Sequence, residues 1–168
     1  MKITLTCLCS LLLTFCAMSQ NKEITLPAPQ KTGGKPLMET LAARATNRAL
    51  DPEKALSQQQ LSNMLWAAWG INRPDGRRTA ASAMNCQEID LYLIGKQGAY
   101  LYNATKHALE PVATGDFRSQ VSAQEFAKNG DWIVIFVADH NKMKNASDVT
   151  AGIDAGLIAQ NIYLYGAS

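Results

Sequence analysis

The sequence predicts a single α+β domain in which helices flank an antiparallel or mixed central sheet. The spacing of apolar residues predicts elements in the order helix, helix, strands, helix, strand, helix. It shows neither a repeated βαβ unit nor the evenly spaced short strands of a sandwich. The composition supports this class, since 168 residues that are 47% hydrophobic and 18% charged are ordinary for one globular domain.

Residues 1–19 are predicted to be a signal peptide and not part of the domain. Lys2 supplies a positive start, and an apolar stretch follows from Ile3 to Phe15. Ala17-Met18-Ser19 then places small residues where a signal peptidase cuts, so cleavage is expected after Ser19. The apolar stretch is too short for a membrane-spanning helix. The mature protein is therefore expected to be exported, to the periplasm of a bacterium.

Lipoprotein anchoring through Cys16 is the alternative for this leader. Phe15 argues against it, because a small residue normally precedes a lipidated cysteine. The other leader cysteines are Cys7 and Cys9, so the mature chain keeps only Cys86. An exported domain with one cysteine has no internal disulfide and must be stabilised by its core and by assembly.

The charge balance excludes two classes of partner. Removing residues 1–19 takes away Lys2 and no acid, which leaves 15 basic and 14 acidic residues and a net charge of +1. This balance argues against nucleic acid as the main partner and predicts no strong attraction to an anionic membrane. A metal site is not predicted either, since His107, His140 and Cys86 lack a ligand spacing.

The N-terminal half is predicted to contain an extended lead-in and two helices. Residues 20–36 carry prolines and glycines without an apolar period, and Pro36 suits the first turn of a helix that ends near Arg44. Ser57 and Gln60 have the spacing of a capping box. The helix that they open should end at Gly70, before a basic loop over residues 71–78.

Strands dominate the middle of the chain. Residues 89–94 and 99–102 read as a hairpin around a glycine-containing turn, and residues 109–112 as a third strand. Ser122 and Glu125 form a second capping-box pattern that should open a brief helix. The continuous apolar run over residues 132–138 is typical of a strand that is covered on both faces.

The last segment, residues 147–165, is predicted to be a helix that is apolar nearly all round and therefore buried in a core or an interface. Gly152 and Gly156 lie one turn apart and would let another helix approach closely. The sequence stops soon after this helix without a closing turn or strand. We therefore expect the C-terminal part of the domain to be missing from the sequence.

Two segments carry residues that suit a ligand. Arg44-Ala45-Thr46-Asn47-Arg48 places two guanidinium groups around a hydroxyl, which suits a phosphate, although a solvated basic turn is the alternative. Residues 77–87 combine small residues with Ser82, Asn85 and Gln87. Such a loop can approach a flat ring closely and pair with an imide-like edge, although an ordinary polar loop is the alternative.

Taken together, the two segments resemble the nitroreductase family, and within it the SagB-like dehydrogenase branch. The resemblance covers residues 37–168, which would form a nitroreductase-like FMN-binding domain. The family's Arg-x-Ser/Thr-x-Arg/Lys segment falls on Arg44, Thr46 and Arg48 and implies contacts with the FMN phosphate and ribityl chain. Its Pro-Ser-x-x-Asn segment falls on residues 81–85, with alanine in place of the proline, and implies that Ser82 and Asn85 reach the flavin of the partner subunit.

The resemblance implies further roles. Gln124 matches an amide side chain that pairs with the pyrimidine edge of the flavin, and the helix over residues 147–165 matches the central helix of a homodimer. The activity implied is hydride transfer through flavin N5, either to a small nitroaromatic or quinone-like acceptor or from a small substrate, with NAD(P)H as a possible donor. No protein acid or base is required by this scheme, and we name no catalytic residue.

Two points leave alternatives open. Family members continue beyond the last helix into a glycine-rich segment beside the flavin, a strand and late basic residues, which this sequence lacks. A non-catalytic flavin-binding or dimerisation module is therefore the main alternative, and a flavin-transforming or dehalogenating enzyme is a third. NAD(P)H is also not expected to be abundant outside the cytoplasm, so the donor stays open.

Overall fold

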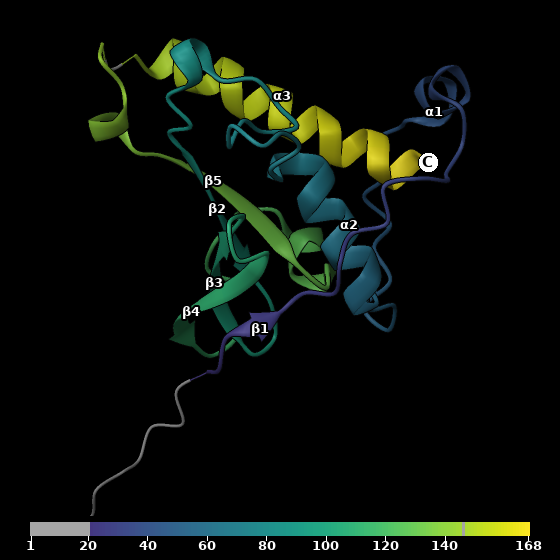
Figure 1. Cartoon of the computed structure of the whole chain (residues 1–168). Coiled ribbons are helices and arrows are strands. Elements are labelled where there is room, and N and C mark those ends of the chain that lie inside the picture. Colours follow the sequence, from purple (N-terminus) through teal and green to yellow (C-terminus); the bar gives the residue numbers. More distant parts are fainter. Residues whose placement is uncertain (1–20, 146) are drawn as a thin grey trace, which may run out of the picture.

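The computed structural model describes residues 21–145 and 147–168 (Figure 1). The predicted signal peptide, its cleavage site and Cys16 lie outside the described residues. The described chain contains three α-helices and five strands: α1 Leu37–Ala43, α2 Gln58–Trp69, α3 Asp148–Ala167, β1 Ile24–Thr25, β2 Ile89–Ile94, β3 Gly98–Asn103, β4 Ala108–Thr114 and β5 Ile133–Ala138. Three short 3-10 helices, η1 Ala83–Asn85, η2 Glu125–Asn129 and η3 His140–Lys142, lie between them.

The five strands form one antiparallel sheet in the order β1-β4-β3-β2-β5. The predicted hairpin is confirmed, since Tyr92 faces Leu101 across β2 and β3, and Gly95 N donates to Gly98 O at 2.9 Å in the turn. The third predicted strand is β4, which begins and ends slightly outside the predicted range. The α+β class is confirmed, and the sheet is antiparallel rather than mixed.

One face of the sheet forms the core with α2 and α3, which lie together on that side (Figure 1). Alternate residues of a strand point to opposite faces, so β2 directs Ile89, Leu91 and Leu93 toward the helices. Leu65 of α2 and Ile158 of α3 meet them and have no exposed surface. This packing fixes α3 against the sheet along one side only.

Helix α2 begins and ends where the sequence predicts. Ser57 Oγ accepts from Gln60 N at 3.2 Å, and Gln60 Oε1 accepts from Ser57 N at 2.9 Å, which completes the capping box. The second capping-box prediction is wrong. Ser122 Oγ accepts from Gln124 N at 3.1 Å, one residue too early for a box, and the segment that follows is the 3-10 helix η2.

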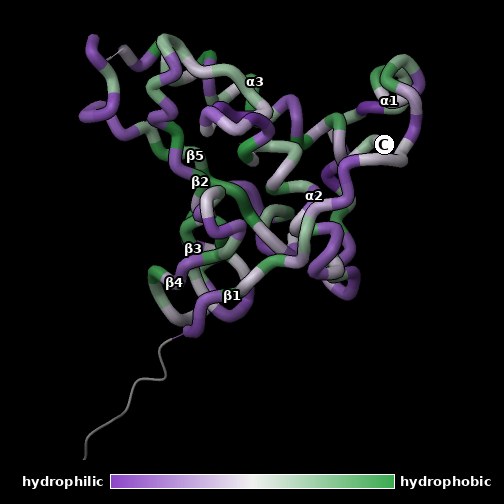
Figure 2. The backbone as a smooth tube through the Cα atoms, viewed as in Figure 1, coloured by the Kyte–Doolittle hydropathy of each residue, from purple (hydrophilic) through white to green (hydrophobic). Residues whose placement is uncertain are grey.

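Strand β5 is confirmed, but the expectation that it is covered on both faces is wrong. It pairs only with β2 and forms an edge of the sheet as described. Val134 and Phe136 pack toward the core, while Val137 on the opposite face is 40% exposed. Figure 2 shows the hydrophobic colouring that runs along β5. Apolar side chains therefore lie on both faces of β5, but the described chain covers only one of these faces.

The lead-in is held more firmly than its sequence suggests. Ile24–Thr25 forms β1, which pairs with β4, and the buried Leu26 N donates to His107 O at 3.2 Å. His107, directly before β4, is half-buried. The lead-in is thus hydrogen bonded to both the sheet and α2 through the residues around His107.

The protonation of His107 follows from its partners. Buried Ser62 Oγ donates its one proton to Pro27 O at 2.6 Å, so it must accept from His107 Nε2–H, 2.7 Å away. Nδ1 then carries no proton and accepts from Tyr102 OH at 3.0 Å. Burial lowers the pKa of His107 and the charge of Lys31 lowers it further, whereas the nearby main chain of Pro27 raises it.

The substitution His107→Asn tests this network, and asparagine tolerates the positive φ of 48° at this position. We expect a loss of about 1–2 kcal/mol of unfolding free energy at pH 7.5. Because the folded state resists protonation of His107, the wild-type protein should also lose stability as the pH falls below the ordinary histidine pKa. Urea unfolding at pH 7.5 and 5.5 measures both effects, and an equal pH response in the two proteins would contradict the network.

Candidate functional site

The first predicted FMN segment lies at the surface directly after α1. Arg44 is the C-cap residue of that helix, and Ala45, Thr46 and Arg48 that follow are exposed. The Arg44 guanidinium lies over the ring of Tyr163 near the end of α3, 5.8 Å from its centroid. Ala45 lines a small cavity of about 340 Å³ together with the last turns of α3.

The same segment reaches the region of Gln124. The Arg48 guanidinium lies 5.9 Å from the ring centroid of Phe126, and Leu56 N donates to Asp131 Oδ2 at 2.8 Å. Gln124 itself is exposed and precedes η2. Arg48 and Gln124 therefore belong to one part of the molecular surface, although no contact joins their side chains within residues 21–145 and 147–168.

The second predicted segment is a compact loop around η1. Ser82 Oγ accepts from Gln87 N at 3.0 Å, and Asn85 Oδ1 accepts from Gln87 Nε2 at 3.1 Å. Met84, Asn85 and Gln87 all have positive φ, at 51°, 55° and 50°. Such a backbone is uncommon outside glycine and persists only where surrounding contacts hold it. Within the described residues no group accepts the Ser82 hydroxyl proton or the Asn85 amide N–H groups, so these donors could serve a ligand.

A buried carboxylate and a half-buried guanidinium supply those contacts. Ala83 N donates to the carboxylate of Asp154 in α3 at 2.7 Å, and Asp154 is only 4% exposed. Half-buried Arg78 donates to Gln87 Oε1 at 2.8 Å and to Trp69 O at 3.0 Å. Burial lowers the pKa of the Arg78 guanidinium, which nevertheless stays charged. The loop is therefore anchored at both ends.

Within one chain the two predicted segments contact α3 at different places. The Ser82 loop meets the helix at Asp154, whereas Arg44 meets it at Tyr163. Nine residues of α-helix separate these positions by roughly 14 Å along the helix axis. The structure thus places Arg48 beside the segment that follows Gln124, and it holds the Ser82 loop against a different part of α3 from Arg44.

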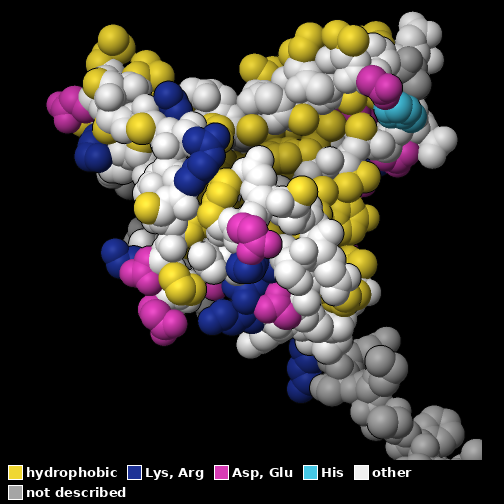
Figure 3. All heavy atoms as spheres, turned by 180° about the vertical axis from the view of Figure 1, so that it is seen from behind, with side chains coloured by type: hydrophobic (Ala, Val, Ile, Leu, Met, Phe, Trp, Pro, Cys, Tyr) yellow, Lys and Arg dark blue, Asp and Glu magenta, His cyan; other side chains and the backbone are white. Residues whose placement is uncertain are grey.

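Much of α3 is apolar and exposed, and the prediction that it is buried holds for one side only. Figure 3 shows hydrophobic side chains gathered over α3 and α1 on this face of the molecule. Val149, Ile153 and Leu157 are 74%, 61% and 44% exposed, and recur at a spacing of four residues. A Cβ atom on Gly152 or Gly156 would meet nothing within 4 Å. We call this exposed apolar side, Val149 to Leu157 with the two glycines, the α3 face.

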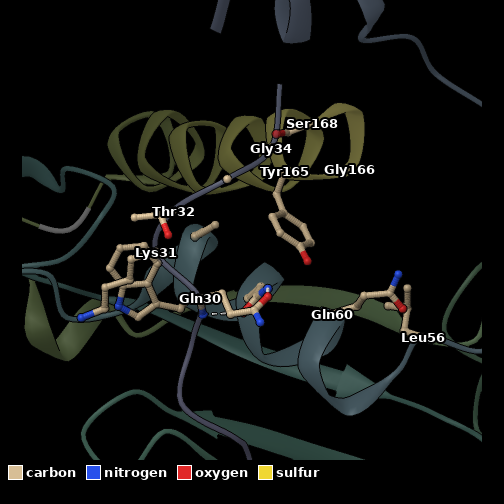
Figure 4. A pocket seen from close by; sticks show the side chains of 13 residues that line it. Gln30, Lys31, Thr32, Gly34, Leu56, Gln60, Tyr165, Gly166 and Ser168 are labelled. Carbon is tan, nitrogen blue, oxygen red and sulfur yellow. Dashed lines mark hydrogen bonds between the residues drawn. The ribbon is translucent and has the colours of Figure 1, made fainter. Parts of the chain in front are cut away.

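A cavity of about 540 Å³ lies elsewhere, between the lead-in, α2 and the end of α3. Figure 4 shows Tyr165 pointing from α3 into this cavity, above Gln30 of the lead-in and beside Gln60 of α2. An adjoining cavity of about 430 Å³ shares Trp66 and Tyr165 and contains the buried Thr79 hydroxyl, to which no described group is hydrogen bonded. None of the predicted FMN residues lines either cavity.

Within residues 21–145 and 147–168, no group of three or more His, Cys, Asp or Glu side chains could hold a metal ion. In the same part of the chain, no helix combines the length and hydropathy that crossing a membrane requires.

Three residues that support these segments were not predicted from the sequence. Tyr163 and Phe126 stack under the two arginines, and Asp154 caps the Ser82 loop. Of the three, only Asp154 could have been recognised in the sequence, because a carboxylate in the middle of an apolar helix needs a buried partner. The aromatic partners could not be found, since their pairing depends on how α3 and η2 pack.

The family comparison agrees with this fold. The family model described as the nitroreductase family matches residues 41–168. A solved structure assigned as a nitroreductase, from Ralstonia eutropha JMP134, is 38% identical with a TM-score of 0.81, and the match covers 89% of this chain and 73% of that one. No match is found among curated proteins.

Two more distant structures share the fold. One, from Desulfovibrio desulfuricans, is assigned as a nitroreductase in complex with FMN; it is 18% identical over 80% of this chain and 63% of that one, with a TM-score of 0.53. The other, the E. coli microcin synthetase McbBCD complex with truncated pro-MccB17 bound, is 19% identical over 96% and 69%, with a TM-score of 0.60. On the family model and the 38% identical structure, the chain belongs to the nitroreductase family.

Proposed function

We propose that this protein is an FMN-dependent oxidoreductase. Membership of the nitroreductase family supports a flavin oxidoreductase in general, and a solved relative in the family fold is described with FMN. The observation that carries the proposal in this chain is the pair Arg44 and Arg48. Each guanidinium is held over an aromatic ring, and within the described residues neither is ion-paired to a carboxylate.

The donor groups of this segment fit the phosphate end of FMN. Guanidinium groups bind phosphate through two parallel N–H donors, and unpaired arginines at a surface keep that capacity. Thr46 adds an exposed hydroxyl between them. Gln124, on the same part of the surface, supplies an amide that can pair with an imide edge. When bound, FMN would supply the hydride chemistry, and these side chains would bind and orient it.

We further propose that the functional unit is a homodimer formed through the α3 face. The face exposes aliphatic side chains beside two glycines, as a closely packed helix pair requires. A two-fold axis that pairs α3 with its copy in the opposite direction brings the early part of one helix toward the late part of the other. Ser82 and Asn85 of one chain would then approach Arg44 of its partner.

The substrate side is proposed at the level of chemical class. We assign a small organic acceptor of the nitroaromatic or quinone type, with NAD(P)H as donor. We also propose that the chain belongs to the SagB-like branch, because the sequence Leu65-Trp66-Ala67-Ala68 precedes Arg77-Arg78-Thr79-Ala80. Export to the periplasm is proposed from the leader. A non-catalytic flavin-binding and dimerisation module is the second candidate, favoured by the solvent-exposed position of the arginine segment.

Visible absorption after loading with FMN and removal of the excess tests the cofactor. A retained flavin spectrum supports the assignment, and a folded protein without flavin contradicts it. Turnover then separates the two candidates: oxidation of NADH or NADPH with a quinone or nitroaromatic acceptor indicates the enzyme. If the protein binds flavin tightly but only dithionite reduces the bound flavin, the result indicates the binding module.

A further inference from the structure

The lead-in is fastened along one side of α2. Its main chain is hydrogen bonded to side chains of this helix: Pro27 O accepts from Ser62 Oγ at 2.6 Å, Ala28 O accepts from Gln59 Nε2 at 3.0 Å, and Gln30 N donates to Asn63 Oδ1 at 2.8 Å. These helix residues share one side because positions three and four apart are neighbours on a helix surface. We call residues 26–31 of the lead-in the strap.

The end of the strap forms part of a cavity wall. Residues 30–34 line the cavity of about 540 Å³ from the lead-in, together with Trp66 of α2 and Tyr165 of α3 (Figure 4). The amino group of Lys31 lies over the Trp66 ring, 5.1 Å from its centroid. Displacing the strap would remove this wall and open the cavity to solvent.

The strap is also tied to the half-buried His107. Leu26 N donates to His107 O at 3.2 Å, and the Ser62 hydroxyl bridges His107 Nε2 and Pro27 O. On the other side of the ring, Nδ1 accepts from Tyr102 OH at 3.0 Å, so the imidazole that fits these partners is neutral. Tyr102 is buried, and no other described group accepts its hydroxyl proton.

A proton on Nδ1 of His107 would conflict with this arrangement in two ways. Nδ1–H would face the Tyr102 oxygen as a donor, so the phenolic proton would lose its acceptor, and an unsatisfied buried donor is unfavourable. The ring would also carry a half-buried positive charge near Lys31, and within residues 21–145 and 147–168 no carboxylate is ion-paired to it. If the strap left, water would reach the ring and Lys31 would move away, which relieves both conflicts.

We propose that His107 is a pH-sensitive latch of the strap: the neutral ring holds residues 26–31 against α2, and protonation releases them and opens the cavity. Acid favours release because the open form accepts the proton more readily than the closed form. Closure is therefore complete above the ordinary pKa of histidine and is lost as the pH falls toward the lower pKa of the closed form. None of these groups belongs to the predicted FMN segments, so the latch does not depend on the proposed function.

The charges around His107 agree with this direction. Burial lowers its pKa and Lys31 lowers it further, against the main chain of Pro27, which raises it. From β3, Tyr102 adds no charge, because burial raises the pKa of its hydroxyl, against the charge of Arg78, which lowers it. Helix α2 has no charged residue. Other charged side chains of these segments form exposed ion pairs: Lys106 with Glu23 at 3.2 Å and with Glu110 at 2.8 Å.

Amide hydrogen exchange at Leu26 and Gln30 measures release of the strap, because each N–H group is hydrogen bonded across it. After correction for intrinsic rates, their protection factors should fall between pH 8 and pH 5.5. The fall should be up to tenfold for each unit of difference between the His107 pKa values of the open and closed forms. Both amides should stay less protected than the amides of β2, since the strap opens before the domain unfolds. Protection that is constant with pH, or equal to that of β2, would overturn the proposal.

The two histidines of the sequence allow matched variants. His140, in η3, is exposed and takes no part in this network. His140→Asn should keep the loss of protection in acid, whereas His107→Asn should abolish it, whatever the protection of that variant at pH 8. A loss that persists in His107→Asn, or that disappears in His140→Asn, would overturn the proposal.

The His140→Asn protein also decides the matter by itself if His107→Asn does not fold. Its one histidine should titrate by NMR below the ordinary histidine pKa, and the protection of Leu26 and Gln30 should level off at that midpoint. A His107 that titrates at or above its ordinary value would contradict the latch.

Discussion

The double substitution of Arg44 and Arg48 by alanine is expected to weaken FMN binding at least about 100-fold. Each guanidinium is expected to contribute charge-assisted hydrogen bonds to the phosphate, worth about 1.5–3 kcal/mol apiece. Two such losses sum to about 3–6 kcal/mol, and every 1.4 kcal/mol is a factor of ten. Flavin fluorescence quenching on titration with protein measures the dissociation constant directly.

The matched control removes the same charge elsewhere. Lys22→Ala with Lys96→Ala takes two exposed positive side chains from parts of the surface away from the arginine segment. FMN affinity in this control should stay within about threefold of the wild type, because long-range attraction is screened at physiological salt. Equal losses in both double variants would indicate nonspecific electrostatics and contradict the phosphate site. Unfolding curves on the two proteins check that neither result reflects a damaged fold.

Placing glutamate at Ile153 and Leu157 is expected to convert the protein from a dimer to a monomer. Both side chains are exposed in the single chain, at 61% and 44%, so the substitution leaves the core intact. In a paired α3 face the same positions would be desolvated. Burying four carboxylates without partners, two from each chain, would cost more free energy than the aliphatic packing between the two helices contributes. Sedimentation velocity at micromolar concentration distinguishes the two states.

Val112→Glu provides the control for this experiment. Val112 lies in β4, remote from α3 in sequence, and is 56% exposed. The same change of chemistry there should leave the sedimentation coefficient unaltered. If FMN reaches its site across the dimer, the α3 variant should lose flavin as well, whereas the control keeps it. A wild-type protein that sediments as a monomer would contradict the proposed dimer without further substitution.

Local chemistry explains which elements the sequence could predict. The Ser57 capping box uses only atoms three residues apart, and the hairpin around Gly95 uses a turn of adjacent residues. The apolar alternation of β2 and β3 is likewise local. These elements were therefore predictable with nearly correct bounds. Ser122 shows the limit of such patterns, since its hydroxyl bonded Gln124 and no α-helix followed.

The candidate site was likewise predictable only in part. The residue types of the Arg44 segment, two planar cations around a hydroxyl, are visible in the sequence and suggest a phosphate ligand. Their aromatic supports, Tyr163 and Phe126, come from α3 and η2 and depend on packing. The burial of Glu88 and Asp154 likewise arises only where distant segments of the chain pack over them.

By itself the sequence determined the α+β class, most helix and strand bounds, and the two candidate segments through which it resembles the nitroreductase family. Tertiary structure alone decided that β5 forms an edge of the sheet in the described part of the chain, that His107 is half-buried between Ser62 and Tyr102, and that α3 buries one side and exposes the other. The physical reason is that hydrogen bonding and periodicity act between neighbours in the chain. Burial, and the protonation states that follow from it, depend on which distant surfaces come together.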